Sequence, residues 1–483
     1  MTEARSDTAI AAGIWLAAVA FYLTFDPFNR FVGLDAATWD WMSISLLDGR
    51  IPYRDVFLHK TPGAALLGGA GAALARTLGA TPLAGAHASC IAFGAAGPAL
   101  LYLICRERMG VIAALAAAAF MLSFDQWVVA SVEGVRPKIF TTTLGLVALL
   151  ASERRRWLAA GIAGGAATLC WQPGLAFLLG SLWALRAEES GGRIHAVTRM
   201  AVGAAIAPAL LLAWLAAAGA LRDFFAQSIL FNFQYIHLHA RSPEGTLRRL
   251  LKLTRQWNPA ELFLLAPALL GALLQRSRVP AGLMVAGAAY LALAFVSFQA
   301  WPDMILFSAP TAALLAAGLS SLVPASAPWQ AVVLALAAAL AARPASARLE
   351  PPITFEDQSR FMHSLTTELT DDDTVLVVSL PEFMIHTGRQ SVWKWPYLWF
   401  GVDRFAAEST PGGFDALLAE LSRHPPGLML VARRWQGPLR AQFDRWAAPL
   451  YRRTRVHHHP HTVKPINVYR LDRAPRTHPS DDG

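Results

Sequence analysis

Residues 84–105 read AGAHASCIAFGAAGPALLYLIC, without one Asp, Glu, Lys or Arg, and Arg106 and Arg108 follow them. A helix that crosses a bilayer needs roughly 17–25 mostly apolar residues, so this stretch predicts a membrane span. Similar segments recur at 9–25, 110–124, 137–152, 157–172, 174–186, 200–220, 259–275, 280–299, 304–323 and 328–342. The sequence therefore predicts a mostly α-helical, polytopic bundle of about 11 transmembrane helices.

The charged residues divide the chain into two parts. Of its 483 residues, 55% are hydrophobic, and the formal net charge is +9. Residues 1–342 hold 24 basic and 17 acidic residues, about 12%, whereas 343–483 hold 18 and 16, about 24%, the value of a soluble domain. We expect a transmembrane module over 1–342 and a soluble domain over 343–483. The apolar composition excludes disorder for most of the chain.

Basic residues between the apolar segments indicate the orientation. They cluster at 106–108, at 154–156, around 186–199 and at 276–278. If the glycine-rich stretch 62–79 does not cross, all four clusters fall on the side of the N-terminus, which the positive-inside rule makes cytoplasmic. We therefore predict that 62–79 is re-entrant or interfacial and that the C-terminal domain is periplasmic. The outer loops are then 26–61, 125–136 and 221–258.

The soluble domain predicts a small α/β fold. Helices are expected over 355–369 and 412–423, and strands over 374–380, 427–431 and 466–471. Such alternation is typical of a layered sheet. Neither a GxGxxG pattern nor a phosphate-binding loop occurs in the sequence. The scattered basic residues do not form a nucleic-acid footprint, so we expect no nucleic-acid partner.

The sequence gives little support for a cofactor or metal. Cys90, Cys105 and Cys170 stand in apolar runs and offer neither a disulfide framework nor a metal spacing. The histidines at 457–459 and 461 resemble a metal-binding composition, but no carboxylate or cysteine accompanies them at a fixed spacing. No cofactor is therefore assigned, and a divalent metal is possible but unsupported.

The first outer loop, 26–61, concentrates polar side chains. Residues 36–47 suit an amphipathic helix at the membrane interface, with Trp39, Met42 and Leu46 on one face. Asp35 stands just ahead of this helix. It is either the helix N-cap or a carboxylate at the membrane–water boundary that can act as a general base, and both roles can hold together.

The second half of this loop is basic. Its cations either meet lipid head groups or form a pocket for a lipid phosphate. Arginine suits forked binding of phosphate, and lysine supplies a point charge. The residues concerned are Arg50, Arg54, His59 and Lys60.

The order of residues in this loop resembles the first periplasmic loop of the GT-C glycosyltransferases. These include bacterial relatives of protein O-mannosyltransferases and of aminoarabinose transferases. An acidic residue and an aromatic helix precede Leu-Leu-Asp-Gly at 46–49, Pro-Tyr-Arg-Asp at 52–55 and Lys-x-Pro at 60–62. Asp35 precedes Gly49 at the spacing of the family's catalytic aspartate. Ala36 stands where a second acidic residue is usual, and Asp40 follows five residues after Asp35.

The resemblance implies an enzyme that moves a hexose or pentose from a polyprenyl-phosphate carrier to a lipid, glycan or protein acceptor, with inversion, at the bacterial cytoplasmic membrane. Asp35 would be the base, with Asp40 and Glu133 as further acidic candidates. Residues 133–138, 171–174 and 387–389 are similar to other segments of the family. The implied substrate-binding residues are Tyr53, Arg54, His59, Lys60, Arg136, Lys138 and Gln172.

Simpler alternatives remain for several of these residues. Glu133 could be a solvated loop charge, and Gln172 could satisfy backbone groups freed by Pro173. The glycines of 62–79 could line a groove for the prenyl tail or only permit close helix packing. The aromatic residues of 393–399 could stack on sugar or lie on the membrane surface.

Two other functions remain open. One is a transporter or lipid flippase with a periplasmic domain, which the lack of charge within the spans disfavours for ions. The other is a catalytically inactive GT-C scaffold, which Ala36 keeps open.

Overall fold

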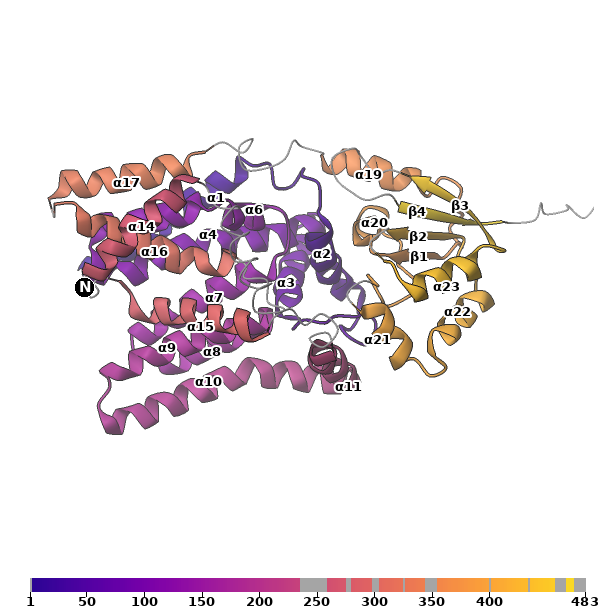
Figure 1. Cartoon of the computed structure of the whole chain (residues 1–483), viewed down its shortest axis with the longest axis horizontal. Coiled ribbons are helices and arrows are strands. Elements are labelled where there is room, and N and C mark those ends of the chain that lie inside the picture. Colours follow the sequence, from indigo (N-terminus) through magenta and orange to yellow (C-terminus); the bar gives the residue numbers. More distant parts are fainter. Residues whose placement is uncertain are drawn as a thin grey trace, which may run out of the picture. The chain divides into compact units, whose positions relative to one another are not determined.

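The computed structural model describes residues 2–234, 259–274, 279–297, 304–324, 326–343, 354–398, 401–432, 435–456 and 466–472. The chain forms two compact units, whose elements are labelled in Figure 1. The first unit comprises Met1–Tyr53 and Leu58–Ile353, and the second comprises Arg54–Phe57 and Thr354–Gly483. The predicted histidine cluster and most of the predicted outer loop 221–258 lie outside the described residues.

The first unit is a helical bundle with apolar surfaces. Among the described residues, four helices are long and apolar enough to cross a membrane: α1 (Thr2–Leu23), α4 (Pro82–Met109), α10 (Ser190–Ala217) and α16 (Met304–Leu322). A fifth candidate is the pair α5 (Val111–Ser123) and α6 (Asp125–Val132), which is bent by 66°. The shorter helices are α7 (Pro137–Glu153), α8 (Trp157–Cys170), α9 (Leu175–Leu182), α14 (Pro259–Leu274), α15 (Ala281–Ser297) and α17 (Ala327–Ala341).

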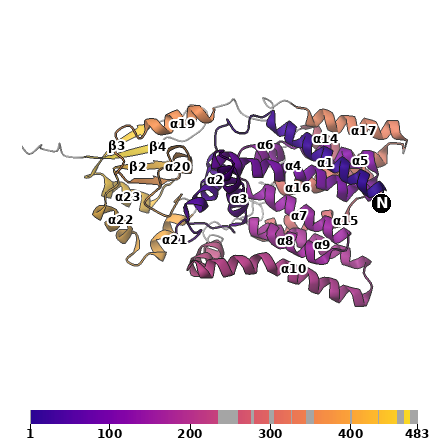
Figure 2. The ribbon, with the colours of Figure 1, turned by 180° about the vertical axis from the view of Figure 1, so that it is seen from behind.

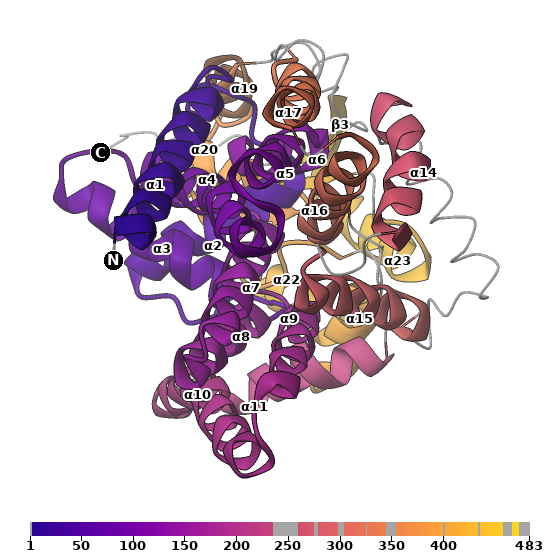
Figure 3. The ribbon, with the colours of Figure 1, turned by 90° about the vertical axis from the view of Figure 1, so that its left-hand side faces the viewer.

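Each of the eleven predicted segments largely coincides with a described helix, so the prediction of a polytopic helical bundle is confirmed. Figure 3 shows these helices from one end, and α7 packs between α4 and α8. The number of membrane crossings stays a prediction. Within the predicted second outer loop, 125–136, the first eight residues form the short helix α6.

An ion pair fixes the bend between α5 and α6. Arg343, just beyond α17, donates from both terminal nitrogens to the Asp125 carboxylate, at 2.9 and 3.3 Å. It also donates to the carbonyl oxygen of Ser123 at 2.5 Å. This carbonyl belongs to the last turn of α5, where backbone acceptors have no partner within the helix. Arg343 therefore stabilises the break that turns α6 away from α5.

The glycine-rich stretch forms α3 (Gly63–Thr77), which is shorter than a membrane crossing requires. A Cβ atom at Gly69 would lie 2.9 Å from the Leu46 side chain, and one at Gly71 would collide with the carbonyl oxygen of Gly85 in α4. These glycines therefore permit α3 to pack closely against its neighbours, which supports the packing alternative. Whether α3 enters the membrane stays a prediction.

The second unit contains a four-stranded sheet of order β1-β2-β4-β3, whose strands are labelled in Figure 1 and seen from behind in Figure 2. The strands are β1 (Val375–Val378), β2 (Leu428–Ala432), β3 (Tyr451–Val456) and β4 (Ile466–Leu471). β1 and β2 are parallel, and the other pairs are antiparallel. Both parallel strands are buried along their whole length, which explains their continuous apolar sequence. The helices are α19 (Phe355–Ser364), α20 (Pro381–Thr387), α21 (Val402–Ser409), α22 (Gly413–Arg423) and α23 (Pro438–Ala447).

Four residues of the first loop belong to the second unit. The Phe57 amide donates to the carbonyl oxygen of Lys394 at 2.7 Å. The ring of Phe57 is fully buried and lies 4.9 Å from that of Trp395 and 5.9 Å from those of Tyr397 and Phe405. Two of the aromatic residues predicted for sugar stacking or membrane contact therefore pack on a segment of the first loop.

Candidate functional site

The predicted interfacial helix is α2 (Leu34–Ser45), and it presents Asp35 to a pocket in the first unit. The N-cap of α2 is Gly33, and no side chain caps this helix end. The N-cap prediction for Asp35 is therefore wrong. Asp35 lies one residue inside the helix, where a carboxylate interacts favourably with the helix dipole, and 73% of its side-chain surface is accessible.

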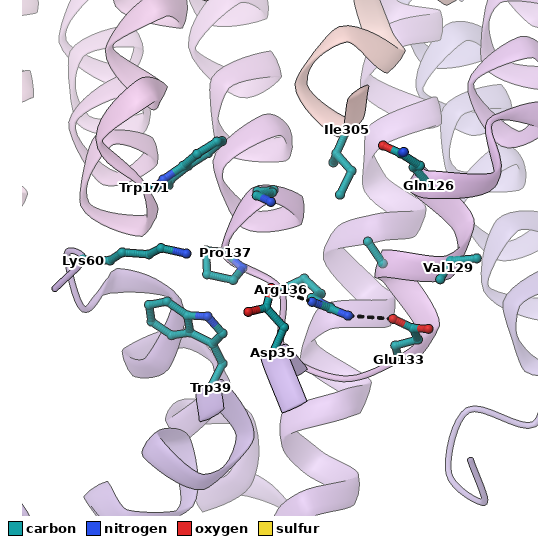
Figure 4. Close-up of a pocket in the computed structure, with 12 residues that line it drawn as sticks. Asp35, Trp39, Lys60, Gln126, Val129, Glu133, Arg136, Pro137, Trp171 and Ile305 are labelled. Atoms are coloured by element: carbon teal, nitrogen blue, oxygen red, sulfur yellow. Dashed lines mark hydrogen bonds and ion pairs between the residues drawn. The ribbon is translucent and has the colours of Figure 1, made fainter. Parts of the chain in front are cut away.

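The pocket has a volume of about 280 Å³ and is lined by both charged and apolar side chains (Figure 4). Its lining comes from α2, from the first loop, from α6 and the turn after it, from α7, from the break between α8 and α9, and from α16. The lining residues are Asp35, Trp39, Lys60, Gln126, Val129, Ala130, Glu133, Arg136, Pro137, Lys138, Trp171 and Ile305.

Arg136 joins the two carboxylates of the pocket. Its Nη1 lies 3.0 Å from Oδ2 of Asp35, and its Nη2 lies 2.6 Å from Oε2 of Glu133. Figure 4 shows the guanidinium between the two acids. Because each contact is a charge-assisted hydrogen bond, the pair of contacts fixes the position of both carboxylates. Asp35 and Arg136, which are 101 positions apart in the sequence, thus form an ion pair in the folded chain.

The charges around Asp35 keep it ionised. The protein atoms around the pocket displace water and would by themselves raise the pKa of Asp35, although its side chain reaches solvent. The positive charges of Arg136, Lys60 and Lys138 outweigh this effect and lower the pKa to about 2. Burial would likewise lower the pKa of Arg136, yet Asp35 and Glu133 together raise it. The resting pocket therefore holds an ionised Asp35 beside a permanently charged guanidinium.

Each lysine of the pocket lies against an indole ring. The Lys60 ammonium is 5.8 Å from the centre of Trp39, and the Lys138 ammonium is 5.3 Å from that of Trp171. Both distances lie within the range of a cation–π interaction. The two cation–π contacts thereby hold both ammonium groups at the pocket.

Tyr53 holds the loop that carries Lys60, and neither Tyr53 nor His59 lines the pocket. The Tyr53 hydroxyl donates to the Lys60 carbonyl oxygen at 2.9 Å. The Gln227 amide donates to the Tyr53 carbonyl oxygen at 2.7 Å and accepts from the Leu58 amide at 3.1 Å. Burial and the adjacent Lys60 lower the pKa of His59 to about 3, so its imidazole is neutral at physiological pH.

Three further predicted site residues also lie outside the pocket lining. Arg54 forms a two-pronged ion pair with Asp55, at 2.8 Å for each contact, and belongs to the second unit. Asp40 is fully buried, beside His87. Gln172 begins a short 3₁₀ turn, Gln172–Gly174, between α8 and α9, and only the preceding Trp171 reaches the pocket.

The sequence therefore identified the charged residues of the pocket and missed several of the uncharged ones. Asp35, Lys60, Glu133, Arg136 and Lys138 were predicted, and the structure brings them together. Gln126 and Ile305 carried no signal in the sequence. Trp171 was indicated by the sequence, because it belongs to the stretch 171–174, which resembles a segment of the family. Among the described residues, no group of three or more His, Cys, Asp or Glu could hold a metal.

No protein-family model matches the chain, and no curated protein matches its sequence. Solved structures show that it is a membrane protein with the GT-C fold, as the first loop predicted. ArnT from Cupriavidus metallidurans, in a crystal structure bound to undecaprenyl phosphate, is similar over 98% of this chain and 98% of its own, with 15% identity and a TM-score of 0.58. The apo oligosaccharyltransferase of Archaeoglobus fulgidus is similar over 87% of this chain and 69% of its own, with 14% identity and a TM-score of 0.50.

Proposed function

We propose that this chain is a membrane glycosyltransferase that moves a hexose or pentose from a polyprenyl-phosphate carrier to an acceptor on the periplasmic side of a bacterial cytoplasmic membrane. The observation that carries the proposal is the pocket, in which Lys60, Lys138 and Arg136 face the carboxylates of Asp35 and Glu133. The fold likeness to ArnT, whose crystal structure contains undecaprenyl phosphate, supports a lipid phosphate as the ligand.

The charges of the pocket suit a phosphodiester donor. Three cations and two carboxylates leave one positive charge, which the single negative charge of a sugar–phosphate–polyprenol neutralises. Lys60 and Lys138 would hold the phosphate, because each is a point-charge donor held at the pocket. The parts of the Trp39 and Trp171 rings that the two lysines leave uncovered would contact the sugar ring, whose C–H groups pack well on indole.

Asp35 would act as the general base. It takes the proton from an acceptor hydroxyl while the hydroxyl oxygen forms a bond to the anomeric carbon. The bond between that carbon and the phosphate oxygen breaks, and the phosphate leaves with the electron pair. Attack from the face opposite the phosphate inverts the anomeric centre. Lys60 and Lys138 stabilise the charge that grows on the leaving phosphate.

The donor would also prepare the base. A carboxylate of pKa about 2 is a weak base, whereas an efficient one has a pKa near the working pH. A phosphodiester between Lys60 and Lys138 offsets part of the positive charge that lowers the pKa of Asp35. Binding of the donor therefore raises this pKa and makes Asp35 a better proton acceptor when the acceptor is present.

Turnover of a labelled carrier tests the proposal. The full-length protein in detergent receives undecaprenyl-phosphate sugars with hexose or pentose groups and lipid, glycan or peptide acceptors. We expect release of undecaprenyl phosphate by the wild type and a roughly 10²- to 10⁴-fold slower release by Asp35→Asn, the usual contribution of a general base. Asp48→Asn is the matched control, because Asp48 is an exposed acid of the same loop outside the pocket.

Two results would favour the other functions. Wild-type protein that releases no carrier from any donor, yet moves labelled lipid across vesicles, is a flippase. If the wild type and Asp35→Asn bind the carrier equally well and neither releases undecaprenyl phosphate from a donor, the protein is an inactive scaffold.

A further inference from the structure

The turn that carries Glu133 and Arg136 has an unusual anchor. It connects α6 to α7, and Val135 at its centre is fully buried. The Val135 amide donates a 2.8 Å hydrogen bond to Oδ1 of Asp40 in α2. A buried amide without a hydrogen-bond partner destabilises the folded state, so this bond fixes the position of the turn relative to α2.

The other oxygen of Asp40 faces α4. Its Oδ2 lies 3.0 Å from Nε2 of His87, and Nδ1 of His87 lies 3.3 Å from the carbonyl oxygen of Pro27. A carbonyl oxygen only accepts hydrogen bonds, so Nδ1 carries a hydrogen. Asp40 and His87 are 0% and 4% exposed. One buried carboxylate thus joins three segments: α2, α4 and the turn after α6.

The turn is shaped to fit this carboxylate. Gly134 has a φ of +122°, a backbone conformation open to glycine. A Cβ atom at this position would lie 2.5 Å from Oδ2 of Asp40 and 3.1 Å from Nε2 of His87. Gly134 and Val135 therefore contact Asp40, and the residues that flank them, Glu133 and Arg136, carry their side chains into the pocket.

We propose that Asp40 is a positioning residue: with His87 and the Val135 amide it holds the turn 133–136 so that Arg136 meets Asp35 and Glu133. It is not a second catalytic acid. The proposal rests on the proposed function for its kinetic consequence, but its structural content is independent of the reaction.

An isosteric amide separates the two roles. In Asp40→Asn, the amide oxygen still accepts from Val135, and the amide nitrogen donates to Nε2 of a neutral His87 whose Nδ1 hydrogen still meets Pro27. The geometry of the network survives without the carboxylate charge. In Asp40→Ala, the Val135 amide and Nε2 of His87 lose their partner, and the turn is released. A general base would lose its function in both variants.

The kinetic test compares these variants with Asp35→Asn in the full-length protein. We expect Asp40→Asn to retain kcat within about fivefold, and Asp40→Ala to lose about 10- to 100-fold in kcat, the effect of leaving buried hydrogen-bonding groups without partners. The KM for the undecaprenyl-phosphate donor should change less than kcat, because Lys60 and Lys138 stay in place. Asp40→Asn as inactive as Asp35→Asn, or Asp40→Ala as active as the wild type, would overturn the proposal.

A second measurement does not need turnover. Infrared titration of the Asp35 carboxylate, identified by subtraction of the Asp35→Asn spectrum, reports whether Arg136 still faces it. The midpoint of the Asp35 titration should stay low in Asp40→Asn and rise in Asp40→Ala. Because Lys60, Lys138, His59 and Glu133 remain in both variants, a difference between the two midpoints reports the position of Arg136. An unchanged midpoint in Asp40→Ala contradicts the positioning role even if the protein turns over no donor. If Asp40→Ala does not fold, the comparison of Asp40→Asn with Asp35→Asn still decides between the two roles.

Discussion

Replacement of Arg136 by lysine tests whether the pocket depends on one cation that reaches two carboxylates. Arg136 uses separate nitrogens for Asp35 and Glu133, at 3.0 and 2.6 Å. A lysine keeps the charge but presents a single ammonium, which cannot reproduce the planar fork. We therefore expect Arg136→Lys to keep one contact and lose the other.

The size of the effect follows from the exposure of the three groups. Arg136 and Glu133 are 20% and 28% exposed, whereas Asp35 is 73% exposed. A hydrogen bond to a charged group contributes about 1.5–3 kcal/mol when sheltered, and an exposed ion pair contributes about 0–1 kcal/mol. The loss in Arg136→Lys should thus be about 1–3 kcal/mol, or about 5- to 150-fold in kcat/KM. Arg136→Met, which removes both contacts, should lose about tenfold more.

The assay is kcat/KM for release of undecaprenyl phosphate from the donor, with the melting temperature of each variant in detergent as the folding control. Arg108→Lys is the matched variant, because Arg108 also pairs with a glutamate, Glu153 at 3.3 Å, but lies outside the pocket lining. It should stay within about twofold of the wild type. An Arg136→Lys variant within threefold of the wild type, or an Arg136→Met variant no worse than it, would show that bridging the carboxylates is unimportant.

Three further predictions concern pH and packing. Because the pKa of Asp35 is lowered to about 2, its carboxylate stays ionised as pH falls until that value is approached. The acid limb of kcat/KM in the free enzyme should therefore not reflect Asp35 above about pH 3, and Lys60→Met should move the Asp35 midpoint upward in an infrared titration. Arg343→Met should lower the free energy of unfolding by about 1–3 kcal/mol and reduce kcat/KM, because the start of α6 loses its ion pair; an unchanged melting temperature would contradict this. Gly63→Ala should cost about 1–3 kcal/mol, measured as a lower melting temperature, because its Cβ atom would lie 2.6 Å from the Leu169 carbonyl carbon, whereas Gly13→Ala, with nothing within 4 Å, should be neutral.

The helices were predictable because membrane spans follow from composition alone. The strands β1 and β2 were predictable because they are short and wholly apolar, and β4 because it contains the β-branched residues Ile466 and Val468 and the aromatic Tyr469. β3 was not, since four of its six residues are exposed and three are arginines. An edge strand of this kind is stabilised by its partner β4, not by an apolar face of its own, and local patterning carries little sign of it.

Some residues of the pocket could likewise be predicted from the sequence, and others could not. Asp35 and Lys60 stood out because charged residues gathered in one short loop beside apolar segments. Ile305 could not stand out, because an isoleucine at the start of an apolar helix resembles every other residue of that kind. Asp40 was grouped with Asp35, yet five residues along a helix is a rotation of about 140°, so the two side chains point to different sides of α2. Helix geometry alone therefore separates the two.

The inclusion of Arg54–Phe57 in the second unit has a consequence for how such proteins diversify. A C-terminal domain joined only at its own start could be exchanged between relatives by a single recombination after the last helix. Here the buried ring of Phe57 packs on Trp395 and Phe405. A transplanted domain would therefore have to pack on the residues 54–57 of its new host, which are encoded about 300 codons upstream and did not evolve with it. Successful chimaeras must carry both pieces together, and the sequences of the first loop and of 393–405 should change in concert during descent.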